Sequence, residues 1–242
     1  MTVAGGLLYK REIPVTDHIH IVIPTVGEVL DHEEEYYGLV SIFTAMPIDM
    51  MVELDDIGID FTSIDEYDLF LLLSESLRAR DTSLVISGVD FKRMHIAQKN
   101  GAGEPGEPVL LDTITGFAID RKMHARIADT LRMLHHLEKD KRKPIDKPTR
   151  DYMVDRARRK RKRHKNDVRS SQLEDLIVAM VNTEQFSYTF ETVKDMTIYQ
   201  FNRSMRQIIN KVDYDNRMHG VYSGTVNPKD LSQSELTWLT CK

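Results

Sequence analysis

The chain has 242 residues, of which 41% are hydrophobic and 29% are charged, and its formal net charge is -5. This composition excludes a membrane protein and argues against wholesale disorder, and the length allows one large domain or two small ones. The single cysteine, Cys241, excludes an intramolecular disulfide and a structural thiolate metal site.

The two signs of charge occupy different parts of the chain. Residues 12–77 contain sixteen Asp and Glu and no Lys or Arg, whereas residues 156–165 contain eight Lys and Arg. No spacing of His, Ser or Cys indicates a nucleophile with its base, so the chain is not expected to be an enzyme. The asymmetry of charge instead favours a protein that binds or assembles with partners.

The front part of the chain is predicted to be a helical unit behind one short strand. Residues 18–23 alternate and favour a strand, and residues 24–27 favour a turn. Apolar spacing predicts helices over residues 33–46 and 47–57, and a capping box at Ser63 predicts a third helix over residues 63–77. The exposed acidic positions proposed to bind partners are Glu33, Glu34, Glu35, Asp55, Asp56 and Asp60.

Two spacings in this part resemble metal sites, but neither predicts one. His18 and His20 lie two residues apart on a strand, with no third ligand close by in sequence. A calcium loop that starts at Asp55 would need oxygen donors where Ile57 and Ile59 stand. We therefore expect half-exposed histidines and helix-end carboxylates, with no metal, cofactor or catalytic residue.

The middle of the chain favours short strands. Residues 84–87 and 109–111 read as strands, with residues 99–108 as a Gly- and Pro-rich loop that could form the tip of a long hairpin, and residues 116–119 as a further strand.

A helix is predicted to follow the last of these strands. Asp120 is expected to cap it, and its apolar positions continue to Leu137. His135 and His136 in its last turns are expected to be surface cations, because successive residues point away from each other.

The second half is predicted to be basic and helical. Residues 138–148 are charged and carry two prolines, which predicts a domain over residues 1–138, a linker over residues 139–149 and a C-terminal region over residues 150–242. The cations proposed to bind a partner are Arg156, Arg158, Arg159, Lys160, Arg161, Lys162, Arg163 and Lys165. This run fits a solvated helix or arm, or one covered by nucleic-acid phosphate, by the acidic helices of this chain, or by those of another copy.

Three helices are expected after the basic run. Capping boxes at Ser171 and Ser232 each predict a helix start, and an amphipathic pattern from Thr197 to Val212 predicts a helix between them. Trp238 is expected to anchor in the core or in a partner. The complete pattern predicts an α+β, predominantly helical protein, with an acidic helical N-terminal unit that carries short strands and a hairpin, and a basic helical C-terminal half.

Several short motifs resemble proteins that form the tails of bacteriophages. Residues 195–201, 214–225 and 235–239 resemble the ends of small tail-morphogenesis proteins. Pro24 and Gly27, the acidic residues that follow, the Asp-rich turn at 55–60 and residues 68–73 are similar to baseplate-hub and tail-assembly proteins of contractile-tailed phages.

The resemblance implies a noncatalytic role in forming a phage tail. It implies a baseplate or hub component that binds other tail proteins, or a tail assembly chaperone that is absent from the finished virion. Self-association through acidic and basic surfaces, and nucleic-acid binding by residues 156–165, stay open beside it. The expected location is the host cytoplasm during assembly, with the virion tail as the later site for a retained component, and no membrane partner is expected.

Overall fold

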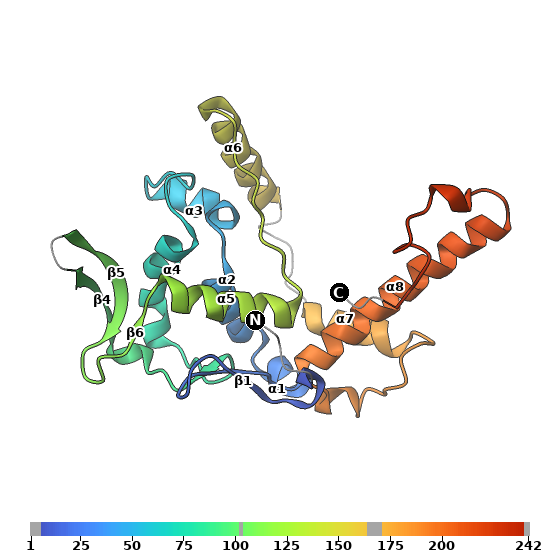
Figure 1. The fold of residues 1–242 in the computed structure, drawn as a ribbon, viewed down its shortest axis with the longest axis horizontal. Coiled ribbons are helices and arrows are strands. Elements are labelled where there is room, and N and C mark those ends of the chain that lie inside the picture. The colour runs from blue at the N-terminus through green and yellow to red at the C-terminus, as the bar shows by residue number, and fades with distance from the viewer. Residues whose placement is uncertain (1–5, 102–103, 164–170, 240–242) are drawn as a thin grey trace. The chain divides into compact units, whose positions relative to one another are not determined.

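The computed structural model describes residues 6–101, 104–163 and 171–239 (Figure 1). These residues form eight α-helices and two small antiparallel sheets, which confirms the predominantly helical α+β class. None of the helices in the described residues is long and apolar enough to cross a membrane. The α-helices are α1 Val26–Asp31, α2 Glu33–Thr44, α3 Met51–Asp56, α4 Glu66–Ser74, α5 Arg121–His135, α6 Lys147–Arg163, α7 Gln172–Val181 and α8 Ile198–Tyr222. The strands are β1 Glu12–Pro14, β2 His20–Val22, β3 Ile86–Ser87, β4 Met94–Gly101, β5 Glu104–Asp112 and β6 Ala118–Ile119. The 3-10 helices are η1 Leu7–Tyr9, η2 Pro47–Met50, η3 Glu75–Ala79, η4 Phe91–Arg93, η5 Val193–Asp195 and η6 Pro228–Asp230.

The described residues divide into two compact units. Unit 1 holds residues 6–9, 24–31 and 171–239. Unit 2 holds residues 10–23 and the described part of 32–170. Unit 2, which includes α6 with its basic run, is therefore inserted into the sequence of unit 1.

The core of unit 2 lies where α2, α4 and α5 pack together. Tyr36, Leu39 and Phe43 recur at helical spacing along α2 and are fully buried. The Phe43 ring stacks on Phe70 of α4, with the ring centroids 5.6 Å apart. Helix α5 adds a buried apolar stripe to this core, and each such side chain contributes roughly 1.5–3 kcal/mol by leaving water. The stripe consists of Ile127, Leu131 and Leu134.

Three short strands form the first sheet of unit 2 in the order β1-β2-β3. Ile21 at the centre of β2 pairs with Ile13 of β1 and with Ile86 of β3, and Ile21 is fully buried. The predicted strand near residue 20 is confirmed. The strand predicted at residues 84–87 is limited to Ile86–Ser87, and it pairs with β2 in this first sheet.

The second sheet contains the hairpin, in the order β4-β5-β6. Strand β4 pairs with β5 over most of its length, with Gln98 opposite Pro108 and Lys99 opposite Glu107. The predicted long hairpin is confirmed, but the loop predicted at residues 99–108 is strand over residues 99–101 and 104–108. Its backbone ladder outweighs the local preference of Gly and Pro for turns. Strand β4 was not predicted, although Met94 and Ile96 alternate along it; Met94 is buried and Ile96 is 55% exposed.

Side-chain caps explain most helix starts, and they correct one prediction. Asp120 accepts a hydrogen bond from the Met123 amide and caps α5, as expected. Helix α4 begins at Glu66 instead of near Ser63, because the carboxylate of Asp65 accepts from the amides of Tyr67 and Asp68. An ionised carboxylate serves the unpaired amides of a first turn well.

Unit 1 is completed by a helix that was expected to be a turn. Helix α1 starts after Thr25, whose hydroxyl accepts from the Glu28 amide while Glu28 accepts from the Thr25 amide. The Val26 amide donates to the Met196 carbonyl and the Ile198 amide donates to the Pro24 carbonyl, each at 2.8 Å. Residues 24–31 are thus joined to the start of α8.

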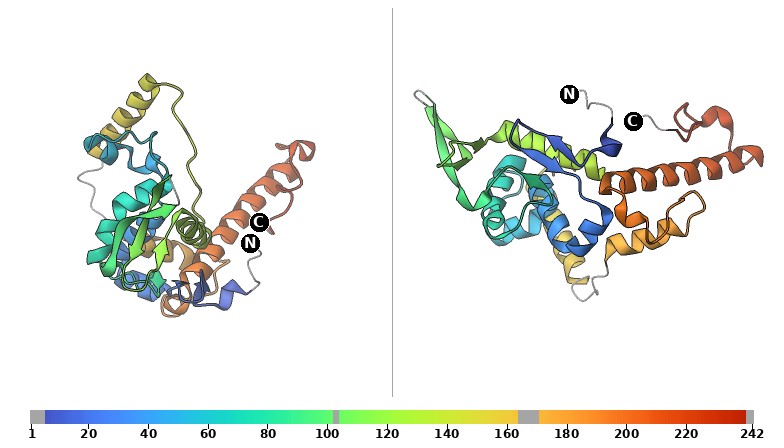
Figure 2. Two further views of the ribbon diagram at one scale, coloured as in Figure 1. Left: turned by 60° about the vertical axis from the view of Figure 1, so that its left-hand side comes forward. Right: turned by 90° about the horizontal axis from the view of Figure 1, so that it is seen from below.

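Helix α8 runs for 25 residues, and the end of the chain returns along it (Figure 2). Gln207 donates to the Trp238 carbonyl at 2.8 Å, and the Lys211 ammonium lies 5.9 Å from the centre of the Trp238 ring. The helix predicted from Ser232 is wrong, because residues 233–236 form a turn. The carboxylate of Glu235 closes this turn by accepting from the amide and the hydroxyl of Ser232.

Candidate functional site

Helix α6 carries the basic run that the sequence singled out, and it has two different faces. Arg150, Val154, Arg158 and Arg161 are separated by four, four and three residues, so they share one face of the helix. We call this set the inner face. It lies against α3 in unit 2 (Figure 1).

The inner face is held by ion pairs to the acidic end of α3. Arg150 and Arg158 each place a guanidinium nitrogen 2.9 Å from a carboxylate oxygen of Asp55, and Arg158 also contacts Asp56. Arg161 lies 2.8 Å from Glu53. The predicted pairing of the basic run with acidic helices of the same chain therefore describes this face.

One apolar side chain fixes the start of this contact. Val154 is 3% exposed and packs in a cluster with Leu54 and Phe61. Arg150 is held on both sides, because it also reaches Asp60 at 3.3 Å. Hydrogen bonds from the amide and hydroxyl of Thr62 lower the pKa of Asp60, so this carboxylate stays charged opposite the arginine.

The opposite face of α6 is basic and exposed. Arg156, Arg159, Lys160 and Arg163 recur at spacings of three, four and seven residues from Arg156, and we call them the outer face. All four are exposed, and within the described ranges no carboxylate pairs with any of them. Lys162 is also exposed, at the edge between the two faces. Lys165 lies outside the described residues.

The predicted acidic residues separate into two groups. Asp55, Asp56 and Asp60 meet the arginines of α6, so their carboxylates bind guanidinium groups. Residues 33–35 form the first turn of α2, where carboxylates stabilise the positive end of the helix dipole. Sequence reasoning missed Arg150 and Glu53, although the spacing of Arg150 from Arg158 was a usable signal.

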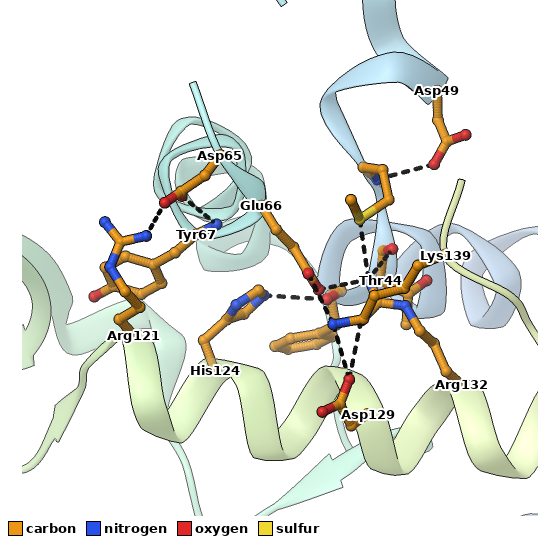
Figure 3. A network of polar contacts seen from close by, with 12 residues as sticks. Thr44, Asp49, Asp65, Glu66, Tyr67, Arg121, His124, Asp129, Arg132 and Lys139 are labelled. Atoms are coloured by element: carbon orange, nitrogen blue, oxygen red, sulfur yellow. Dashed lines mark hydrogen bonds and ion pairs between the residues drawn. The ribbon is translucent and has the colours of Figure 1, made fainter. Parts of the chain in front are cut away.

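A second polar cluster lies between α4 and α5, and it joins the core to the segment after α5 (Figure 3). Arg132, 5% exposed, donates to the Thr44 carbonyl at 2.5 Å and lies 2.5 Å from Glu66. Lys139 bridges Glu66 at 3.1 Å and Asp129 at 3.0 Å. These contacts tie the end of α2, the start of α4 and the segment after α5 together.

Two histidines on α5 are neutral, His124 buried in the core and His135 half-buried against α2. Burial lowers the pKa of His124 to about 4, and its ring bonds the Phe43 carbonyl at 3.1 Å and stacks on Phe70. Burial likewise lowers the pKa of His135 to about 4, and its ring bonds the Tyr36 hydroxyl at 3.0 Å. The expectation that His135 is a surface cation is therefore wrong, because α2 covers the side of α5 on which it lies.

At the start of α4, a charged pair borders the same cluster. Arg121 contacts Asp65 and lies 5.0 Å from the centre of the Tyr67 ring (Figure 3). Burial favours the neutral form of Asp65, but the Asp68 amide and the Arg121 guanidinium outweigh it and lower the pKa of Asp65.

Comparison with known protein families gives one match, in the C-terminal part of the chain. The family model described as the YomV second domain matches residues 161–241, which cover α7, α8 and the returning tail. Searches of curated proteins and of solved structures gave no match. The YomV family derives from a Bacillus phage, so the match points to a phage-related protein.

Proposed function

We propose that the protein is a noncatalytic component of a phage tail, at the baseplate or hub, which binds an acidic surface of another tail protein through the outer face of α6. The match to a phage-derived domain supports the phage setting, and the sequence motifs that resemble tail-morphogenesis proteins support the tail. The protein acts in the host cytoplasm during assembly and stays in the virion tail.

The observation that carries the proposed contact is the division of α6 into two basic faces. The inner face already binds carboxylates presented by a helix, namely Asp55 and Glu53 of α3. The outer face repeats this helical spacing of cations with no acidic partner in the described part of the chain. Helix α6 therefore has its charges matched on one side alone. Such a helix can lie between two acidic surfaces, one in this chain and one in a partner.

An acidic protein surface fits the outer face better than nucleic acid does. No aromatic side chain stands among residues 156–163 to stack on bases. Charge complementarity between helices sets partner choice and register more than affinity, as tail assembly requires.

The decisive variant reverses the outer face, as Arg156→Glu, Arg159→Glu, Lys160→Glu and Arg163→Glu together. Its matched control reverses four exposed lysines elsewhere, at Lys92, Lys122, Lys194 and Lys229, so that both variants change the net charge equally. In a phage deleted for the gene, the control should restore tails seen by electron microscopy and the outer-face variant should not. Tails restored by both variants would contradict the proposal.

Two further measurements separate the competing roles. Mass spectrometry of purified particles should find the protein, whereas its absence from complete particles would indicate an assembly chaperone. Native mass of the purified protein with a short duplex DNA should stay unchanged, and a salt-sensitive shift with DNA that the outer-face variant loses would assign the face to nucleic acid instead.

A further inference from the structure

Unit 2 contains a cavity of about 500 Å³ between η2, the start of α4 and α5. Its apolar wall is formed by Met46, Ile48, Phe61 and Ile64, and residues 140–144 run along its rim. A volume of this size and an apolar wall beside placed polar groups are typical of sites for small organic ligands. Charged side chains also line the cavity, at the start of α4, at the start of α5 and along the rim.

The acidic side chains that line the cavity are neutralised by the protein itself. Asp65 is paired with Arg121, and Glu66 is paired with Arg132 and Lys139. Asp140 on the rim is also paired, because it accepts hydrogen bonds from the guanidinium and the amide of Arg142. The Arg142 bonds lower the pKa of Asp140 to about 2, so the carboxylate stays ionised and paired.

Two lining cations have no such partner. Lys141 and Lys143 stand on the rim segment and line the cavity. Among the described residues no carboxylate pairs with either ammonium group. The charge left over at the rim is therefore positive, while the wall below it is apolar.

From this arrangement we propose that the cavity binds an amphipathic carboxylate, with its apolar chain against Met46, Ile48 and Phe61 and its carboxylate at Lys141 and Lys143. The lysines supply charge-assisted hydrogen bonds to the anionic end, and the wall removes the apolar chain from water. A cationic ligand of the same shape is disfavoured, because its charged end would meet the two lysines.

Such a carboxylate has two sources, a free carboxylic acid or the last residue of a polypeptide. Octanoate serves as the probe for the first, and a pentapeptide that ends in leucine serves for the second, with its amidated form as the control. Tighter binding of octanoate assigns the site to a free acid, and tighter binding of the peptide, lost on amidation, assigns it to a chain terminus.

Binding is followed on the full chain by calorimetry and by the ¹³C-methyl resonance of Met46, assigned with Met46→Leu. We expect octanoate to bind and to shift this resonance, and octylamine to bind at least about tenfold more weakly. Equal binding of octanoate and octylamine would overturn the proposal. Failure of both octanoate and the peptide to bind at millimolar concentration would overturn it as well.

Two variants test the geometry. Lys141→Glu/Lys143→Glu should weaken octanoate binding by about tenfold or more, whereas Lys92→Glu/Lys122→Glu, which makes the same charge change at exposed lysines that do not line the cavity, should not. Ala125→Leu adds a helix-compatible side chain at the lining and should abolish binding with the fold retained. Unchanged affinity in both lining variants would place the ligand elsewhere.

Discussion

Arg132 on α5 lies 2.5 Å from Glu66 on α4, and its side chain is 6% exposed against 18% for the glutamate. Removing Arg132 leaves Glu66 with Lys139 as its remaining cation, so the carboxylate loses much of its compensation in a largely buried place. We expect Arg132→Met to lower the free energy of unfolding by roughly 3–5 kcal/mol in urea titrations. The control Arg142→Met, at a side chain that is 80% exposed, should leave the free energy of unfolding nearly unchanged. Glu66→Gln added to Arg132→Met should recover part of the loss, and equal effects of the two arginine variants would contradict this role.

Stability should fall as the solution becomes acidic, because the buried His124 and the half-buried His135 are neutral in the folded protein. Their pKa values of about 4 in the folded state lie below the ordinary value of 6.5, so the unfolded chain binds protons first as pH falls. Each histidine should therefore remove roughly 3 kcal/mol of unfolding free energy between pH 6.5 and pH 4.

His124→Phe isolates the contribution of one histidine. The aromatic ring keeps the stacking on Phe70 but cannot bind a proton, so the slope of unfolding free energy against pH should decrease between pH 4 and 6.5. The variant loses the hydrogen bond to Phe43 and should be less stable at pH 7 as well. An unchanged slope would show that His124 titrates normally in the folded protein.

The two faces of α6 should respond differently to charge reversal. Arg158→Glu/Arg161→Glu places like charges against Asp55, Asp56 and Glu53, and it should lower the hydrogen-exchange protection of amides in residues 156–163. Global stability should change less than this local protection, because the ion pairs are partly exposed. The outer-face variant should leave the protection near its original level. Equal loss in both variants would mean that the α3 pairs do not hold the helix.

The stability of unit 1 should depend on residues 24–31, which lie far in sequence from the rest of that unit at residues 171–239. Val26 is fully buried, so Val26→Ala should cost roughly 1–3 kcal/mol and reduce amide protection at the start of α8. Val178→Ala on α7, at a side chain that is 47% exposed, provides the control and should have little effect. Unchanged protection of Phe201 in Val26→Ala would contradict the observed joining of α1 to α8.

Much of the helical content could be predicted because it rests on local signals. The apolar spacing of α2, the Asp120 cap of α5 and the Thr197 start of α8 act within a few residues. Helix α1 also has a local signal, because Thr25 and Glu28 stand three residues apart and form reciprocal hydrogen bonds. The preference of Pro24 for a turn obscures this signal in the sequence.

The candidate site was only partly predictable, because its contacts are distant in sequence. The charge of Arg158 was evident, but a solvated helix and three anionic partners stayed open, and only folding places Asp56 beside it across 102 residues. His135 is half-buried because its ring contacts Tyr36 of α2, 99 residues away. Lys141 lines the cavity beside side chains of η2 and α4, which are also distant in sequence. The spacing of residues along the chain does not predict these contacts between distant elements.

The insertion of unit 2 has a consequence for synthesis on the ribosome. Residues 24–31 leave the exit tunnel early, but their partners Met196 and Ile198 are translated more than 160 residues later, since the Ile198 amide bonds the Pro24 carbonyl. Unit 2 has its whole sequence available first and can fold while α1 still lacks its partner helix. The nascent chain must therefore carry the apolar Val26 and Val29 without the start of α8 until residues 196–198 have been translated, which leaves this short segment open to nonspecific association.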